Sequence, residues 1–440
     1  MPNVERSIPI VALIGRPNVG KSTLFNRLVG QRAAVVEPQP GTTRDRIYGE
    51  LEWRGQAFAI VDTAGIAWHD PAPVAEAAVA QAEAAAEEAD LVLIVTDALT
   101  GVTALDSVVA REVLRRGRPH VLVVNKADHM DLRQDTGAFY SLGLGDPIAI
   151  SAMHGTATGD LLDLVVARLP SAEYEDCPEE RPRLAIVGRP NVGKSSLLNA
   201  LLGEERALVH QTPGTTRDSV DTIMSWEGQS VRLIDTAGIR RRGHIDPGVE
   251  YHSVLRALRS IQRCDIGLLA LDADEGPTAQ DAHVAGLVLD AGKGIVVLAN
   301  KWDLLGDTEM RREVDHHLER MFHFLPDAPF LHVSALTGRR VSAIISAGLQ
   351  VHTVRRTHVA TGPLNRFLRG WVGRRGAPSS KGRQARFKYA TQVGVSPPSF
   401  VMFFSRPENV HLSYVRYLEN GLRKTFGFAG TPIVIRLRSS

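Results

Sequence analysis

Short apolar runs alternate along most of the chain with longer segments of helical character. Residues 91–98 (LVLIVTDA), 121–126 (VLVVNK) and 294–301 (GIVVLANK) are apolar runs of strand length, and the Ala- and Glu-rich residues 74–89 are typical of a helix. Strands that alternate with helices form parallel sheets covered by helices on both faces. The pattern therefore predicts an α/β protein with doubly wound, mostly parallel sheets.

The pattern changes after Gly362. An amphipathic stretch over residues 364–374 precedes two extended segments, at 385–393 and 399–405, and then a helix and a final strand. The order α-β-β-α-β predicts a small α+β domain that begins near Thr361.

The sequence before this domain contains an internal repeat. The segments GRPNVGKS, PGTTRD and DTAGI each occur twice in the same order, and Lys21 and Asp62 match Lys194 and Asp235 at one common offset of 173 residues. A repeat of this kind predicts two copies of one domain. The acidic, proline-containing residues between the copies suit an exposed linker. The predicted organisation is a first domain over 1–169, a linker over 170–182, a second domain over 183–360 and a third over 361–440.

Composition and charge narrow the class of protein. The chain has 440 residues, of which 44% are hydrophobic and 23% charged, and its two cysteines, Cys177 and Cys264, give no disulfide framework. This composition excludes a disordered or disulfide-scaffold protein, and no apolar run is long enough for a membrane helix. Residues 361–440 contain 14 Lys and Arg against two acids, a net charge of +12, whereas residues 1–360 have −10. A basic domain on an acidic body favours contact with a nucleic acid, although it could also neutralise the body internally.

The two GRPNVGKS segments have the chemistry of phosphate-binding loops. Each fits G-x-x-x-x-G-K-[ST] between an apolar strand and a helical pattern, the context that this motif requires. Glycines allow backbone N–H groups to approach phosphates, the lysine neutralises phosphate charge and the hydroxyl that follows is a magnesium ligand. The nucleotide-binding residues expected here are Gly15, Asn18, Gly20, Lys21, Ser22 and Thr23, with Gly188, Asn191, Gly193, Lys194, Ser195 and Ser196 in the second copy.

The two NKxD segments indicate which base is bound. An aspartate accepts two hydrogen bonds from the N1–H and N2–H₂ donors of guanine, whereas adenine would leave it unpaired, and such polar matching discriminates strongly. The asparagine amide can reach the N7 side of the base, the lysine stem can cover the ring, and a backbone N–H from a following Ser-Ala pair can meet O6. These residues are Asn125, Lys126, Asp128, Ser151 and Ala152, with Asn300, Lys301, Asp303, Ser334 and Ala335 in the second copy.

The DTAG and PGTTRD segments complete a switch-type site. An aspartate at the end of a strand suits a magnesium site, the glycine amide can face the γ-phosphate, and a threonine in a mobile loop can join the metal. The expected catalytic residues are Lys21, Thr43 and Gly65, with Lys194, Thr216 and Gly238. The expected magnesium ligands are Ser22, Thr43 and Asp62, with Ser195, Thr216 and Asp235.

Together, these motifs resemble the Der/EngA family of bacterial ribosome-assembly GTPases. The likeness covers essentially all 440 residues, including the two sets of motifs and the basic third domain. It implies two tandem P-loop GTPase domains followed by a KH-like domain, hydrolysis of GTP to GDP with Mg²⁺, and nucleotide-controlled docking on the rRNA of the large ribosomal subunit during its assembly. We expect a cytoplasmic monomer that makes no contact with membranes.

One position differs from Ras-type GTPases, which have a water-orienting Gln after DTAG. This chain has Ile66 and Ile239 there, and an alkyl group cannot hydrogen-bond water. Similarity to related GTPases with this replacement implies that K⁺, ligated partly by Asn18 and Asn191, stabilises the transition state. The alternative is that both asparagines only brace their loops.

Two other functions remain open from the sequence. One copy could hold GTP as a structural ligand while the other hydrolyses it, or the chain could be the GTPase partner of an RNA-modifying enzyme. Residues 373–376 (GRRG) also match the GxxG loop of RNA-binding KH domains, but this is a weak pattern, and the family resemblance favours a KH-like module without that loop.

Overall fold

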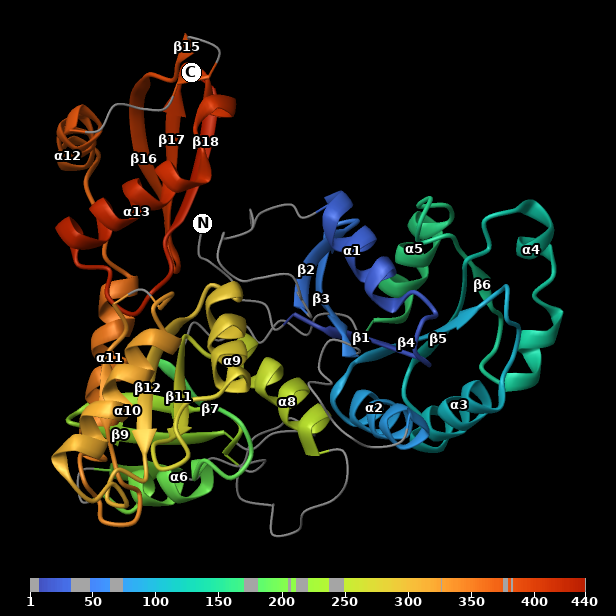
Figure 1. The fold of residues 1–440 in the computed structure, drawn as a ribbon, viewed down its shortest axis with the longest axis horizontal. Helices are drawn as coiled ribbons and strands as arrows, with labels where there is room; N and C mark the ends of the chain where they lie inside the picture. The colour runs from blue at the N-terminus through green and yellow to red at the C-terminus, as the bar shows by residue number, and fades with distance from the viewer. Residues whose placement is uncertain are drawn as a thin grey trace. The chain divides into compact units, whose positions relative to one another are not determined.

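The computed structural model describes residues 8–32, 48–63, 74–169, 181–204, 207–210, 221–236, 249–325, 327–374, 379–380 and 383–439. These residues form two compact units, drawn in Figure 1. The first contains the described residues before 180 together with 249–262, and the second contains the others.

The first unit is built on a six-stranded sheet in which β2 and β3 are antiparallel and the other neighbours are parallel. Its strands, in spatial order, are β2 (Tyr48–Trp53), β3 (Gln56–Asp62), β1 (Ile10–Ile14), β4 (Leu91–Asp97), β5 (His120–Asn125) and β6 (Ile148–Ala149). Every residue of β1 and β4 is buried, which explains why these two continuous apolar runs occupy the centre of the sheet.

Helices cover both faces of this sheet (Figure 1). Buried leucines and valines join α1 (Lys21–Arg32) and α5 (Thr158–Arg168) to one face. The other face is covered by α2 (Val74–Glu88) and α3 (Ala104–Arg116). The unit also contains α4 (Met130–Gln134), η2 (Gly137–Leu142) and most of α8 (Val249–Arg263), in which Arg256 pairs with Glu88 at 2.8 Å.

The second unit contains a seven-stranded sheet with the same central arrangement. Its strands, in spatial order, are β13 (Phe330–His332), β12 (Gly294–Asn300), β11 (Ile266–Asp272), β7 (Arg183–Val187), β10 (Gln229–Leu233), β9 (Thr222–Trp226) and β8 (Ala207–His210). The associated helices are α6 (Lys194–Leu202), α9 (Ala279–Asp290), α10 (Thr308–Met321) and α11 (Ser342–Arg355). The edge strand β8, which the sequence analysis did not predict, extends this sheet beyond the first.

The C-terminal domain, in the same unit, has the predicted α-β-β-α-β order. It consists of α12 (Thr361–Arg374), β16 (Phe387–Val395), β17 (Pro398–Phe404), η3 (Pro407–Asn409), α13 (Leu412–Phe426) and β18 (Val434–Ser439), with a short unpredicted hairpin of β14 (Ser379–Ser380) and β15 (Arg383–Gln384). Both helices pack on one face of the β16-β17-β18 sheet, through Leu364 and Leu368 of α12 and Leu418 and Leu422 of α13.

The fold positions both predicted sites in one way. In each large sheet the strand before the P-loop, β1 or β7, lies between neighbours reached by connections in opposite directions. Ligands of doubly wound sheets bind at the carboxyl ends of strands at such a switch point. The predicted doubly wound α/β class is therefore confirmed. Within the part of the chain that the structure describes, no helix has the length and apolarity needed to cross a lipid bilayer.

Candidate functional site

Both P-loops adopt a conformation that requires glycine. Gly15 has φ +143° and Gly20 has φ +94°. A Cβ on Gly15 would lie 2.2 Å from the carbonyl oxygen of Val95, and one on Gly20 would lie 2.4 Å from Nδ2 of Asn125. Gly188 and Gly193 meet the same obstacles in the second copy, from Ala270 and Asn300. The glycines thus permit a close approach of the loop to the neighbouring strands.

The P-loop lysines are held by the carbonyl groups of their own loops. Nζ of Lys21 donates to the carbonyl oxygens of Gly15, at 2.6 Å, and Arg16, at 2.9 Å. Lys194 does the same with Gly188 and Arg189, at 2.8 and 2.5 Å. Burial lowers the pKa of Lys21 to about 8, although the negative charge of Asp62 acts in the opposite direction. A phosphate beside this ammonium would stabilise its charged form.

The NKxD asparagines connect the P-loop to the Ser-Ala segment. Nδ2 of Asn125 donates to the carbonyl of Val19 at 2.8 Å, and its Oδ1 accepts from the N–H of Ala152 at 3.0 Å. Asn300 bonds Val192 and Ala335 with 2.9 and 3.0 Å distances. All these groups are buried or partly buried, so each asparagine braces two loops of its site. The sequence analysis did not predict this bracing role.

The aspartates of the two NKxD segments differ in their contacts. Oγ of Ser151 donates to Oδ1 of Asp128 at 2.6 Å. Oδ1 of Asp303, in contrast, is buried and accepts no hydrogen bond from the described residues. An unsatisfied buried acceptor is costly, and the N–H donors of guanine would satisfy it. The residues present in the second copy therefore fit a guanine base.

The first copy places two of its three predicted magnesium ligands, Ser22 and Asp62, together. Oγ of Ser22 donates to Oδ2 of Asp62 at 2.5 Å, and Thr63 donates to the carbonyl of Leu13 at 2.6 Å, which fixes the end of β3 beside β1. A hydroxyl and a carboxylate at one point are the hard oxygen donors that Mg²⁺ requires. These residues fit a magnesium ion bound with nucleotide phosphates.

The second copy differs at the corresponding aspartate. β10 ends at Leu233, and Asp235 beyond it has φ +55°. The backbone N–H of Asp235 donates to Oδ1 of Asp221 at 3.0 Å, and Thr236 contacts Thr222 at 2.8 Å. The two copies thus share the P-loop geometry and the bracing by the NKxD asparagines, but their backbones differ where the DTAG segment begins.

Several predicted residues lie outside the described residues. They are Thr43, Gly65 and Ile66 of the first copy and Thr216, Gly238 and Ile239 of the second. Asn18 and Asn191, the expected K⁺ ligands, are described: both have left-handed backbones, at φ +66° and +65°, and exposed side chains.

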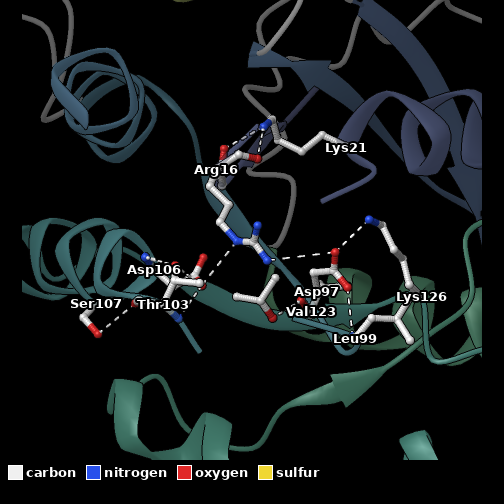
Figure 2. A network of polar contacts seen from close by, with 11 residues as sticks. Arg16, Lys21, Asp97, Leu99, Thr103, Asp106, Ser107, Val123 and Lys126 are labelled. Carbon is white, nitrogen blue, oxygen red and sulfur yellow. Dashed lines mark hydrogen bonds and ion pairs between the residues drawn. The ribbon is translucent and has the colours of Figure 1, made fainter. Parts of the chain in front are cut away.

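The structure adds an ion-pair network to the first site (Figure 2). Nζ of Lys126 lies 2.7 Å from Oδ2 of Asp97 at the end of β4. The guanidinium group of Arg16 lies 3.9 Å from Asp97 and 3.5 Å from Asp106. Asp106 also forms a capping box with Thr103 at the start of α3. Burial opposes ionisation of Asp97, but the hydrogen bond and charge of Lys126 together with the backbone N–H groups of Leu99 and Thr100 outweigh it, so the pKa of Asp97 is lowered.

The second site repeats this network. Lys301 pairs with Asp272 at 2.5 Å, and Arg189 pairs with Glu275 at 2.6 Å and Asp281 at 3.3 Å. Asp281 caps α9 with Thr278 in the same way. The aspartates and threonines of the two networks occur at one offset of 175 residues, and this repeated spacing is the sequence signal of the network.

A phosphate-binding loop and an NKxD segment at the same sheet edge, present twice, define a P-loop GTPase with two nucleotide sites. The sequence models of two families match the chain: the 50S ribosome-binding GTPase at residues 10–126 and 183–301, and the KH-domain-like C-terminal domain of EngA bacterial GTPases at 358–438. The chain belongs to the Der (EngA) family and is a GTP-binding and GTP-hydrolysing protein, as the motifs predicted.

Individual relatives match over nearly their whole length. GTPase Der of Herpetosiphon aurantiacus is 49% identical over 436 residues, which cover 97% of this chain and 96% of that protein. GTPase Der of Thermomicrobium roseum is 50% identical over 441 residues, covering 98% and 96%. The similarity therefore includes both GTPase domains and the KH-like domain.

Proposed function

We propose that this GTPase acts in assembly of the large ribosomal subunit, where its KH-like domain docks on rRNA in a nucleotide-dependent way. The observation that supports this most directly is the charge of that domain, with 14 Lys and Arg against two acids, Glu408 and Glu419. One acid is already used within the domain, because Glu419 pairs with Arg423 at 2.9 Å. The remaining positive charge suits a phosphate backbone.

The connection between the second GTPase domain and the KH-like domain supports the dependence on nucleotide. The N–H of Ile295, at the start of β12, donates to the carbonyl of Gly430 at 2.7 Å. The same strand ends at Asn300, which braces the P-loop and the Ser-Ala segment. One strand thus joins the base-recognition loops to the KH-like domain, and a change at one end has a direct route to the other.

In the proposed reaction the residues of each site bind, orient and neutralise. Lys21 and Lys194 would stabilise charge on the transferred phosphate. Ser22 and Asp62 would hold a magnesium ion, which would supply charge neutralisation at the phosphate oxygens. Threonines 43 and 216 and glycines 65 and 238 are proposed to approach the γ-phosphate. Asn18 and Asn191 are proposed to ligate K⁺, which would replace the positive charge that other GTPases obtain from an arginine.

The test is co-sedimentation with purified large ribosomal subunits in GDP and in a non-hydrolysable GTP analogue, at two salt concentrations. We expect binding in one nucleotide state that falls steeply with salt. A chain without residues 361–440 should lose subunit binding but still bind fluorescent GDP, which shows that the GTPase domains remain folded. Undiminished subunit binding by that chain, or equal binding in both nucleotides, would contradict the proposal.

A further inference from the structure

The face of the KH-like sheet opposite α12 and α13 carries aromatic and basic side chains that have no role in the nucleotide sites. The core residues Phe400, Met402 and Phe404 of β17 point toward the helices. Because side chains alternate along a strand, Val401 and Phe403 lie on the opposite face. We call the residues at one end of that face, Tyr389, Phe403 and Arg438, the aromatic platform.

Strand pairing brings the three residues of the platform together. Tyr389 of β16 is paired with Phe403 of β17, and Phe403 is paired with Arg438 of β18. The two rings are stacked, with centroids 5.1 Å apart and planes inclined by 17°. Tyr389 is 42% exposed, and Arg438 is also exposed. A stack of one exposed ring, Tyr389, and one partly buried ring, Phe403, is thus adjacent to a cation in the same row of the sheet.

The platform lies away from the second GTPase domain. Strands β16 and β17 are joined near Pro397, which approaches Gly292 of that domain, whereas Tyr389 and Phe403 belong to the other end of the hairpin. Figure 1 shows this other end of the sheet beside the C-terminus. The platform is therefore not part of the contact between these two domains.

The positive charge of the surrounding strands favours a ligand that carries phosphates. Strands β16, β17 and β18 contain no acidic residue. Lys388 in β16, Arg386 just before it and Arg438 in β18 are all exposed. Exposed aromatic rings bind bases by stacking, and cations between them bind phosphates. An apolar protein surface could pack against the rings, but it would have no negative groups to pair with these cations.

We propose that the aromatic platform binds single-stranded RNA, with bases stacked on Tyr389 and Phe403 and phosphates paired with Arg438. The proposal rests on the proposed docking of the KH-like domain on rRNA and specifies the form of RNA that it contacts. Duplex RNA cannot bind in this way, because its bases are stacked on one another and only its backbone and groove edges are accessible.

The test uses the full-length protein and a fluorescent single-stranded RNA of roughly 12 nucleotides, within the site sizes of such surfaces. Binding is measured by anisotropy, with the same strand in a duplex as a comparison. We expect Tyr389→Ala to weaken single-strand binding by about 5- to 100-fold, the contribution of one stacked base, and to leave duplex binding unchanged. Tyr389→Phe keeps the ring and should bind like the wild type.

Two arginine variants test the phosphate contact. Arg438→Gln should weaken RNA binding. It should also reduce the slope of the logarithm of the affinity against the logarithm of the salt concentration by about one. Arg416→Gln removes the same charge from an exposed position on α13, one of the two helices on the other face, and should have no such effect. Ultraviolet cross-linking to an RNA with brominated uracil should attach the base to the peptide that contains Tyr389 or Phe403.

Each contrary result has a definite meaning. Wild-type RNA affinity in Tyr389→Ala, or an equal loss in Arg416→Gln, would overturn the proposal. Loss of ribosomal-subunit binding by Tyr389→Ala with unchanged RNA affinity would assign the face to a protein partner and would also overturn it. If the wild-type chain does not bind the ribosomal subunit but the platform variants bind RNA more weakly as expected, the proposed function is contradicted and the RNA site is supported.

Discussion

The ammonium group of Lys126 lies 2.7 Å from the carboxylate of Asp97, at the adjoining ends of two parallel strands. Asp97 itself is buried and accepts a hydrogen bond from the N–H of Leu99, so it is fixed before any ligand binds. The lysine stem is thereby held over the point where the base is expected. The equivalent pair, Lys301 and Asp272, has a distance of 2.5 Å.

This pair predicts the effect of Asp272→Asn on the second site. Loss of the carboxylate frees Lys301, and because this lysine is 34% exposed, the loss should be moderate. We expect the dissociation constant for GDP to rise roughly 3- to 10-fold. The measurement is a fluorescent-GDP titration in a Lys21→Ala background, which silences the first site. Asp274→Asn removes the same charge from an exposed neighbour and should change nothing.

The fold and the main motifs followed from the sequence because they depend on local pattern. Continuous apolar runs gave the buried strands, and the spacing of Gly15, Gly20 and Lys21 requires one particular loop. The ion pairs of Asp97 with Lys126 and Arg16 were not predicted, because they join residues that are distant in the sequence and meet only when the sheet forms. Nor does the spacing of the second copy reveal that Asp235 adopts φ +55°.

The bracing asparagines predict a combined loss of stability and binding. Asn300→Ala removes the bond to the Val192 carbonyl and leaves the N–H of Ala335 without its acceptor. We expect the free energy of unfolding of this domain to fall by about 1–3 kcal/mol, with weaker GDP binding at the second site. Asn300→Asp keeps the acceptor for Ala335 but sets a buried carboxylate oxygen against the Val192 carbonyl oxygen, so it should lose at least as much. Chemical denaturation and GDP titration measure the two effects, and unchanged stability in Asn300→Ala would contradict the bracing role.

Guanine specificity at both sites predicts a switch of base in Asp128→Asn and Asp303→Asn. The amide presents a donor to the 2-position of the base, which suits the oxygen of xanthine rather than the amino group of guanine. We expect each variant to lose GTP affinity and gain xanthosine triphosphate affinity at its own site. Calorimetric titration with both nucleotides measures this. Equal binding of ATP and GTP by the wild type would show that the aspartates do not select the base.

The lowered pKa of Lys21, about 8, predicts proton uptake on nucleotide binding. Above that pH the free site holds neutral lysine, and a bound phosphate restores its charge. In a Lys194→Ala background, the affinity of the first site for GDP should fall by up to about tenfold per pH unit above pH 8. Binding enthalpies measured at this pH in two buffers of different ionisation enthalpy report the proton. Absence of a buffer effect would show that Lys21 is charged in the free protein.

The same group affects the stability of the nucleotide-free protein in a defined direction. Between about pH 8 and the ordinary lysine value of 10.5, the unfolded chain binds more protons at Lys21 than the folded chain does. The contribution of Lys21 to the free energy of unfolding therefore increases as pH rises through that window. It is lost again as pH falls through the window to about 8. Bound nucleotide should remove this dependence, and thermal unfolding with and without GDP compares the two.

Potassium dependence is the prediction that separates the two interpretations of the P-loop asparagines. Because Ile66 and Ile239 cannot orient water, a cation must supply the missing electrostatic stabilisation of the transition state. Asn18 and Asn191 are exposed, with their backbones held in the left-handed region, and an amide oxygen is a suitable ligand for a hard cation. Hydrolysis should be faster in K⁺ than in Na⁺ at matched ionic strength.

Variants at these two asparagines assign the effect to its site. Asn18→Ala and Asn191→Ala should each remove part of the K⁺ acceleration. Asn26→Ala and Asn199→Ala make the same chemical change at exposed positions of α1 and α6 and should retain all of it. Steady-state phosphate release in the two salts measures the ratio. If a loop variant slows turnover equally in K⁺ and Na⁺, its asparagine braces the loop and does not ligate the ion, and equal wild-type rates in the two salts would leave no role for K⁺ at either site.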